Sequence, residues 1–295
     1  MREAASGCHD GGVPGTLYLV GTPIGNLGDL SERARETLAR VDLVACEDTR
    51  RTGRLLRAIG VAARLVSFFE GNEARRTGEL LAALRRGRDV ALVSDAGMPG
   101  LSDPGERLVR AASEAGIEVR VVPGPSAAVA ALVVSGLPTG RFVFEGFLPR
   151  KPSERRARLR ALAAEPRTVV LFESPRRVRT LLRELLEVLG DRRVALCREL
   201  TKLHEEVLRG RASEVLEVLG EREPRGEVVL VVEGAPAAPP PFEELVGEAR
   251  ALVAGGMRRR DAAATVARRW GASANELYRA LLGREASAAA ITQGE

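Results

Sequence analysis

The sequence predicts an α/β protein with two successive α/β domains and a small helical region at its C-terminal end. Short apolar runs alternate with amphipathic helical patterns from Leu17 to Ser135, which is typical of a mostly parallel sheet with crossover helices. A second series of apolar runs, from Phe142 to Val232, has shorter crossovers and favours a mixed sheet. After Pro241 only helical periodicity remains.

Turn-rich segments and changes in composition give the expected boundaries. We expect a disordered, glycine-rich tail over residues 1–15 and an N-terminal α/β domain over 16–138. A second α/β domain follows over 139–235. A proline- and alanine-rich linker spans 236–241, before a helical domain over 242–295.

The overall composition points to an intracellular protein with a polyanionic partner. No apolar run approaches the roughly 20 residues of a membrane helix, and the N-terminus lacks a signal-peptide pattern, so we expect a cytoplasmic location. The net charge is +5, and all but two of the 45 basic residues (Lys151 and Lys202) are arginines, whose planar group suits phosphate. Cys8, Cys46 and Cys197 have neither metal-ligand nor disulfide spacing.

The predicted strands of the first domain each run into a loop that could face a ligand. Leu17–Val20 precedes a glycine-rich loop over 21–29, after which Ser31 is expected to cap a helix. The strand Leu43–Cys46 runs into the charged segment 47–51, which is either a substrate-side site or a solvated charge cluster. A third strand over 65–69 precedes a helix over 77–86.

The fourth strand, Val90–Val93, precedes the most distinctive loop of the chain. Glycines and prolines interrupt residues 94–105, and the loop carries Asp95 and Asp103. Ligands of open α/β sheets bind beyond the carboxyl ends of strands, which is where this loop is expected. The alternative is a surface loop without a ligand.

A fifth strand runs from Val119 into a Pro-Gly-Pro turn. Ser126 is then expected to cap a helix over 127–135, whose first backbone N–H groups can receive polar ligand atoms.

Two basic segments are candidates for contact with nucleic acid. Arg150, Lys151, Arg155 and Arg156 open the second domain and form either an RNA-phosphate patch or a solvated helix face. Arg258, Arg259 and Arg260 flank a predicted helix–turn–helix, in which Asp261 begins a helix ending at Gly271 and Ser273 and Glu276 form a capping box. This hairpin is either a nucleic-acid-binding element or a simple docking domain.

Seven short motifs occur in an order that resembles the ribosomal RNA-modifying members of the tetrapyrrole methylase superfamily. They are Leu19–Asp29, Glu47–Arg50, Ser94–Gly97 with Asp103–Gly105, Pro123–Pro125, Glu145–Pro149, Phe172–Ser174 and Arg198–Lys202. Each motif alone is modest, but together and in this order they are highly specific. The resemblance spans about residues 17–234, and the C-terminal helices also resemble those of such proteins.

The resemblance implies a chemistry, a cofactor and partners. It implies methyl transfer from S-adenosylmethionine to the 2′-hydroxyl of a cytidine in the decoding region of 16S rRNA, within the small ribosomal subunit. It also implies a homodimer whose two α/β domains bind the cofactor between them. Neither a metal nor a membrane is expected.

Several loops together are expected to supply the cofactor contacts. Asp95 is the expected carboxylate contact, backbone groups around Gly97–Ser102 are expected to hold the methionine part, and Gly226 and Glu227 are expected on the adenine side. The full expected set is Pro23, Gly25, Asp95, Gly97, Met98, Leu101, Ser102, Gly124, Ser126, Ala127, Phe147, Gly226 and Glu227.

A ribose hydroxyl is a poor nucleophile at neutral pH, so a side chain is expected to accept its proton or to stabilise the developing oxyanion. The candidates are Glu47, Asp48, Glu199 and Lys202, all of which follow predicted strand ends. One hypothesis is that Lys202 and Glu199 orient the hydroxyl. In the same hypothesis, Asp48 with Arg50 shapes the acceptor side and Arg50 contacts RNA.

Two other functions fit the same sequence. One is a methylase of a small tetrapyrrole or precorrin, since a fold alone does not determine the substrate. The other is a non-enzymatic RNA-binding protein that uses its C-terminal hairpin.

Overall fold

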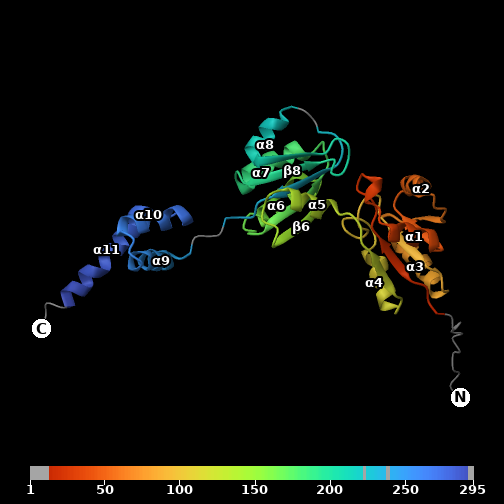
Figure 1. Cartoon of the computed structure of the whole chain (residues 1–295), viewed down its shortest axis with the longest axis horizontal. Helices are drawn as coiled ribbons and strands as arrows, with labels where there is room; N and C mark the ends of the chain where they lie inside the picture. Colours follow the sequence, from red (N-terminus) through yellow and green to blue (C-terminus); the bar gives the residue numbers. More distant parts are fainter. Residues whose placement is uncertain (1–12, 222–223, 237–239, 292–295) are drawn as a thin grey trace, which may run out of the picture. The chain divides into compact units, whose positions relative to one another are not determined.

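A computed structural model describes residues 13–221, 224–236 and 240–291 of the chain, which divides into two compact units, Met1–Ala235 and Pro236–Glu295. Most of the expected disordered tail, residues 1–12, lies outside the described residues. So does the middle of the expected linker, residues 237–239. The first unit contains two five-stranded sheets, and the second unit contains three helices (Figure 1).

The first sheet is entirely parallel, with the strand order β3-β2-β4-β1-β5. Its strands are β1 (Leu17–Val20), β2 (Leu43–Cys46), β3 (Leu65–Ser67), β4 (Val90–Val93) and β5 (Val119–Val122). The segments that follow them contain the 3-10 turn η1 (Leu27–Asp29) and the helices α1 (Glu32–Arg40), α2 (Thr49–Ala58), α3 (Glu73–Arg85), α4 (Glu106–Glu114) and α5 (Ala127–Val134). Because all five strands are parallel, their carboxyl ends lie along one edge of the sheet.

Alternating side chains of the first sheet supply two separate cores. Leu17, Val90 and Leu92 pack with the inner faces of α3 and α4. Their neighbours in sequence, such as Tyr18 and Ala91, pack with α1 and α2 on the opposite face. Both faces of the central strands are therefore buried, which explains why these strands read as continuous apolar runs.

The second sheet is mixed, with the order β6-β7-β10-β8-β9. Its strands are β6 (Phe142–Phe147), β7 (Thr168–Glu173), β8 (Arg193–Arg198), β9 (Glu206–Arg211) and β10 (Val228–Val232), and its helices are α6 (Pro152–Ala161), α7 (Val178–Leu189) and α8 (Ala212–Leu219). The last strand, β10, lies in the centre and runs antiparallel to both β7 and β8. Its start, at Val228, therefore lies beside the ends of those two strands, at Glu173 and Arg198.

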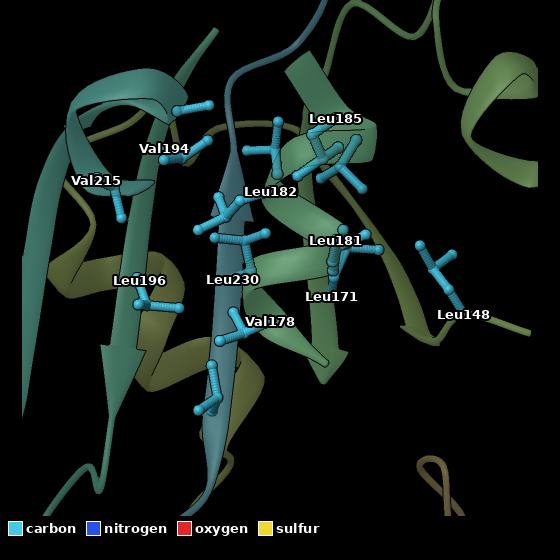
Figure 2. Packing of buried hydrophobic residues seen from close by; sticks show 14 of the residues in the cluster. Leu148, Leu171, Val178, Leu181, Leu182, Leu185, Val194, Leu196, Val215 and Leu230 are labelled. Carbon is cyan, nitrogen blue, oxygen red and sulfur yellow. The ribbon is translucent and has the colours of Figure 1, made fainter. Parts of the chain in front are cut away.

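One face of the second sheet is covered by α6, α7 and α8. Figure 2 shows Leu171 and Leu230 of the sheet close to Leu181 and Leu182 of α7, and Leu196 of β8 belongs to the same buried cluster. The other face packs against α5, the helix that follows the last strand of the first sheet, through residues such as Ala131 and Val229. One apolar cluster therefore joins the helix after β5 to the second sheet. Below, the first half means the first sheet with its helices, and the second half means the second sheet with its helices.

The second unit is a compact group of three helices, α9 (Phe242–Ala254), α10 (Arg259–Trp270) and α11 (Ala274–Ile291). Its core contains Leu245, Ala263, Val266 and Leu277. The indole Nε1 of Trp270 donates a 2.7 Å hydrogen bond to Glu248, which ties α10 to α9.

The predicted fold class is confirmed: a parallel sheet, a mixed sheet and C-terminal helices are all present. Several details differ from the sequence-based expectation. α3 begins at Glu73 rather than at Thr77, and α10 begins two residues before Asp261. The strand β9 was not expected.

Two expected helix caps have different outcomes. Ser31 caps α1 as expected, because its Oγ accepts a 3.1 Å hydrogen bond from the Ala34 N–H. Ser126 is the N-cap residue of α5, as expected, but its side chain makes no capping hydrogen bond. The Ser126 side chain lies against the cavity described below instead.

Candidate active site

Three loops at the carboxyl edge of the first sheet meet at a very close backbone contact. A Cβ atom added to Gly21, after β1, would lie 2.6 Å from the Gly124 Cα after β5 and 2.7 Å from the Met98 Sδ after β4. Such distances exclude any side chain at Gly21 without a shift of the backbone. The Thr22 N–H also donates a 2.9 Å hydrogen bond to the Gly97 carbonyl, and the Gly97 N–H donates a 3.2 Å bond in return.

The same loops reach the second sheet. Ile24 is buried in the apolar cluster that α5 shares with the second sheet. At the other side, Gly146 lies at the irregularity in the β6–β7 pairing, and a Cβ there would lie 2.6 Å from the Ser102 Oγ. The loop after β4 is thus fixed by contacts from both halves of the unit.

A cavity of about 420 Å³ lies between these loops and the second sheet. Ten of the thirteen predicted cofactor contacts line it, a fraction that makes this cavity the candidate binding site. These ten are Asp95, Gly97, Met98, Leu101, Ser102, Ser126, Ala127, Phe147, Gly226 and Glu227.

The remaining three predicted contacts do not line the cavity. Gly124 makes the backbone contact with Gly21 already described, which positions the neighbouring Ser126. Pro23 and Gly25 flank Ile24, which does line the cavity. Gly25 lies against the Lys202 side chain, because an added Cβ would meet the Lys202 Cγ at 2.4 Å.

Among the described residues the cavity is lined by more carboxylates than basic groups, although bases just outside the lining pair with two of them: Arg177 with Glu173 at 3.1 Å and Lys202 with Glu227 at 3.2 Å. The lining includes Arg51. The acidic lining residues are Glu47, Asp95, Asp103, Glu173 and Glu227. Because like charges in one site disfavour ionisation, the carboxylates of Glu47 and Asp95 add to the effect of burial on the pKa of Asp103.

Three of these acids have raised pKa values: Asp103, Glu47 and Glu173, the last because its carboxyl is buried. Burial, opposed by a hydrogen bond from Ser94 and reinforced by the charges of Glu47 and Asp95, raises the pKa of Asp103 to about 6. Burial and the charge of Asp95 raise the pKa of Glu47 as well. Asp103 lies on the loop that the sequence singled out, but its position in the cavity was not predicted.

Asp95, on the loop after β4, and Asp48, at the start of α2, have different environments. The Asp95 Oδ1 accepts a 3.2 Å hydrogen bond from the Asp48 N–H, and its Oδ2 lies 3.4 Å from Arg51. Asp48 lies outside the cavity lining and caps α2 through the Arg50 N–H at 2.8 Å. Hydrogen bonds from the side chain and the backbone of Arg50 lower the pKa of Asp48 to about 2.

Lys202 and Glu199 form a second polar cluster at the border of the cavity. The Lys202 Nζ donates to Glu199 at 2.7 Å and to Glu227, which lines the cavity, at 3.2 Å. Burial alone would lower the pKa of Lys202, but the hydrogen bond to Glu199 and the charge of Glu227 raise it above its usual value. The side chain is therefore a protonated hydrogen-bond donor at neutral pH.

The loop between β8 and β9 holds this cluster in an unusual backbone conformation. Glu199 and Thr201 adopt left-handed φ values of 51° and 66°, which are uncommon for residues with a side chain. The Thr201 Oγ is buried and has no hydrogen-bond partner among the described residues. Strain of this kind persists only where the surroundings enforce it, and it concentrates at functional sites.

The residues predicted to contact RNA fall in three places. Arg50 is exposed at the start of α2 and pairs with Asp48 at 3.0 Å. Arg150 is exposed, and Lys151, also exposed, pairs with Glu154 at 3.1 Å. Arg156 is half-exposed between Glu184 and Glu187.

Arg155 is a correction to the expected basic patch, because its side chain is buried. Its Nε and Nη2 donate to Glu184 at 2.6 and 2.8 Å, and its Nη1 donates to the Arg150 carbonyl at 3.0 Å. Those bonds occupy the guanidinium and fix α6 against α7. Arg155 therefore belongs to the interior of the second half rather than to a surface that RNA can reach.

The remaining predicted RNA contacts lie at the start of α10, in the second unit. Arg258 and Arg260 are exposed, and Arg259 is half-buried. Arg258 lies 4.0 Å from Asp261 in an ion pair that is open to solvent, and such pairs contribute little to stability.

The sequence-based prediction of the cavity included Phe147, Gly226 and Glu227 of the second half but missed the part at the end of β7. The cavity is also lined by the last two residues of β7, Phe172 and Glu173, and by the two that follow it, Ser174 and Pro175. The motif Phe172–Ser174 was recognised, but only the mixed order of the sheet brings it next to Gly226. Phe172 packs edge-to-face with Phe147, with ring centroids 5.5 Å apart.

The described residues contain no helix long and apolar enough to span a bilayer. Within the same residues, no group of three or more His, Cys, Asp or Glu side chains is placed to hold a metal ion.

Comparison with known proteins relates this chain to a family of methyltransferases. The model of the family described as Tetrapyrrole (Corrin/Porphyrin) Methylases matches residues 16–216. The protein named Ribosomal RNA small subunit methyltransferase I of Synechocystis sp. is 48% identical over 276 residues, 92% of this chain and 99% of that relative. The protein of the same name from Escherichia coli O157:H7 is 46% identical, over 90% of this chain and 94% of that relative.

Solved structures of the same family also resemble this chain. The crystal structure of uroporphyrin-III-C-methyltransferase from Thermus thermophilus is 29% identical, with a TM-score of 0.54. The match covers 74% of this chain and 94% of that protein.

The raised pKa of Asp103 predicts a specific dependence of stability on pH. A carboxyl whose pKa is higher in the folded state stabilises the fold below about pH 4 and loses that contribution as the pH rises through about 6. We expect Asp103→Asn to remove this loss, so the variant gains in melting temperature relative to the unmodified chain between pH 4 and pH 7. Thermal unfolding at several pH values measures the difference. Asp29→Asn, at an exposed position in η1, is the control, and parallel curves for all three proteins would contradict the assignment.

Proposed function

We propose that this chain methylates the 2′-hydroxyl of a cytidine in the decoding region of 16S rRNA. The premise is that the chain belongs to the tetrapyrrole methylase family, and within it to the ribosomal RNA small subunit methyltransferase I group. S-adenosylmethionine is the methyl donor in this proposal, and the cytoplasmic small ribosomal subunit is the partner. The observation that carries the proposal is near-full-length similarity: relatives named for ribosomal RNA methylation share about half of their residues with this chain.

The chemistry of the cavity fits S-adenosylmethionine. When bound, this molecule supplies a methyl group on a positively charged sulfur, together with an amino group and an adenosine. Glu47, Asp95 and Asp103 supply negative charge for the cationic groups. Phe147 and Phe172 provide an apolar wall, and backbone groups of the loop after β4 can receive polar atoms.

The cavity also favours one proton acceptor among the predicted candidates. Glu47 lines it, and a raised pKa makes its carboxylate a better base at neutral pH. Asp48 has a pKa of about 2 and is a poor proton acceptor. We therefore assign Glu47 to accept the proton of the ribose hydroxyl, and Asp48 to cap α2 and orient Asp95 through its N–H.

Lys202 is assigned to the developing oxyanion rather than to proton removal. Its ammonium group has three donors, of which Glu199 and Glu227 occupy two. The third donor is available to the ribose oxygen as negative charge develops on it. Gly25 and the left-handed loop around Thr201 hold the Lys202 side chain in place.

A direct assay distinguishes this function from the two alternatives. Purified protein with radiolabelled S-adenosylmethionine is incubated with small ribosomal subunits that lack the modification, and in parallel with uroporphyrinogen. We expect label in 16S rRNA, recovered as 2′-O-methylcytidine after nuclease digestion. Label in the tetrapyrrole instead would support a small-molecule methylase, as named for the Thermus thermophilus neighbour. RNA binding without any transfer would support a non-enzymatic role.

Replacement of Lys202 tests the proposed oxyanion contact. We expect Lys202→Ala to lower kcat by roughly 100-fold, the magnitude typical of losing one charge-stabilising donor, with little change in cofactor affinity. Lys202→Arg keeps the charge and is expected to recover part of the rate. Lys151, the only other lysine in the sequence, gives a matched comparison: Lys151→Ala is expected to raise KM for the subunit rather than to lower kcat. A Lys202→Ala enzyme of normal kcat would refute the assignment.

We further propose that the chain forms a homodimer through the outer face of α5 and the free edge of the first sheet. α5 is apolar on all sides: Ala128, Ala131 and Leu132 pack on the second sheet, while Val129 and Val133 are 50% and 67% exposed. A helix that is apolar all round usually has both faces covered. Val121, on edge strand β5, is also exposed and extends this surface.

Charged substitutions on this face test the dimer. Because an ionised group loses its hydration when buried, Val129→Asp with Val133→Asp is expected to convert a dimer to a monomer. Light scattering coupled to size-exclusion chromatography measures the mass. Val218→Asp, at an exposed valine of α8, is the control and is expected to leave the mass unchanged. A dimer that survives the double substitution would locate the interface elsewhere.

A further inference from the structure

A second concave surface adjoins the candidate active site. This groove, of about 930 Å³, lies along the ends of β7 and β8 and the start of β10. It shares Pro175 and Gly226 with the first cavity, so the two surfaces adjoin at these residues. The described residues that line it are Pro175, Arg176, Arg198, Glu206, Leu208, Val218, Leu219, Pro224, Arg225 and Gly226.

The groove carries uncompensated positive charge. Arg198 is paired, because its Nε donates to Glu206 at 3.0 Å and its Nη1 donates to the Arg225 carbonyl at 3.4 Å. Arg176 and Arg225 are exposed, and within the described part of the chain neither side chain has a hydrogen bond or an ion pair. Glu206 neutralises Arg198, so the two free guanidinium groups leave the groove with an excess of positive charge.

The charge of the groove is opposite to that of the neighbouring cavity. Arg177 and Lys202 pair with two of the five carboxylates of the cavity, which leaves Glu47, Asp95 and Asp103 against Arg51, whereas three arginines and one carboxylate are the charged residues among the described lining of the groove. A positively charged donor and a negatively charged acceptor strand would therefore be attracted to adjacent but different surfaces. The shared residue Gly226 lies where the two surfaces meet.

The type of lining indicates which part of a nucleic acid the groove fits. Arginine's planar group forms paired hydrogen bonds with phosphate oxygens. Among the described residues that line the groove there is no aromatic ring on which a base could stack, and the remaining walls are aliphatic. Contacts of this kind hold the sugar–phosphate backbone and fix its position without reading base identity.

We propose that this groove binds the phosphodiester backbone of the RNA strand next to the methylated nucleotide, with Arg176 and Arg225 each contacting a phosphate. The proposal rests on the proposed function, since it requires an RNA substrate. The groove is distinct from the basic patch at Arg150 and Lys151 and from the arginines of α10. Because Glu206 pairs with Arg198, that arginine is less available to the RNA, and Glu206 lowers the net positive charge of the groove.

The salt dependence of binding tests the proposal. For single-stranded RNA, each phosphate contact contributes about 0.7 to the slope of log affinity against log salt concentration. The double variant Arg176→Gln, Arg225→Gln is expected to bind the small ribosomal subunit with a slope reduced by about 1.4, and with roughly tenfold lower affinity near 0.1 M salt. Affinity for S-adenosylmethionine, measured by calorimetry, is expected to stay unchanged because neither arginine lines the cavity.

Two further variants make the result specific. Arg85→Gln with Arg86→Gln removes the same charge at the exposed last residue of α3 and at its exposed C-cap, which line neither concave surface, and is expected to keep the normal slope. Glu206→Gln releases Arg198 and is expected to tighten binding and steepen the slope.

The outcomes separate the two proposals. If the unmodified protein methylates the subunit but the groove variant keeps its slope and affinity, the groove proposal is wrong and the proposed function stands. If the Arg85/Arg86 control loses as much as the groove variant, the effect is one of net charge and the groove proposal is again overturned. If the unmodified protein transfers no methyl group to the subunit at any salt concentration, the proposed function itself fails.

Discussion

The close approach of two backbones, at Gly21 and Gly124, is the constraint on which the candidate site depends. A single added carbon at either position would overlap the other chain segment, so the loops after β1 and β5 can meet only where both residues lack a side chain. The paired hydrogen bonds between Thr22 and Gly97 then fix the loop after β4 against them. Because these loops follow adjacent parallel strands, the site is a direct consequence of the order β4-β1-β5.

Burial gives the site its chemical character, and it acts differently on each carboxylate. Asp48, outside the cavity and bonded to Arg50, remains ionised far below neutral pH. Asp103 and Glu47, enclosed with other acids, hold their protons to higher pH. A bound cation would reverse part of this shift by stabilising the ionised forms, so binding of a cationic donor and ionisation of the cavity favour each other. The groove beside the cavity has the opposite charge and would not compete for the same ligand.

Much of the first half could be predicted from the sequence because its strands are short, apolar and separated by glycine- or proline-rich loops. The parallel topology then places all of those loops at one edge, and this is why so many of the expected cofactor contacts lie together. Side-chain partners could not be predicted in the same way. Arg155 has the same sequence context as its exposed neighbours, and only the packing of α6 on α7 gives it Glu184. The strand β9, Glu206–Arg211, was missed because this edge strand carries charged residues and a glycine, where the apolar pattern of a buried strand is absent.

The direction of β10 explains why the second half contributes two surfaces rather than one. As β10 runs antiparallel to β7 and β8, its first residues lie beside the last residues of both neighbours. Gly226 therefore meets Glu199 so closely that an added Cβ would lie 2.1 Å from the Glu199 Oε1, and its φ of 89° favours glycine for a second reason. The Glu227 N–H donates to the same oxygen at 2.9 Å, and Lys202 donates to it at 2.7 Å. One carboxylate thus bonds both to the ammonium group at the border of the cavity and to the backbone at the start of β10, beside the basic groove.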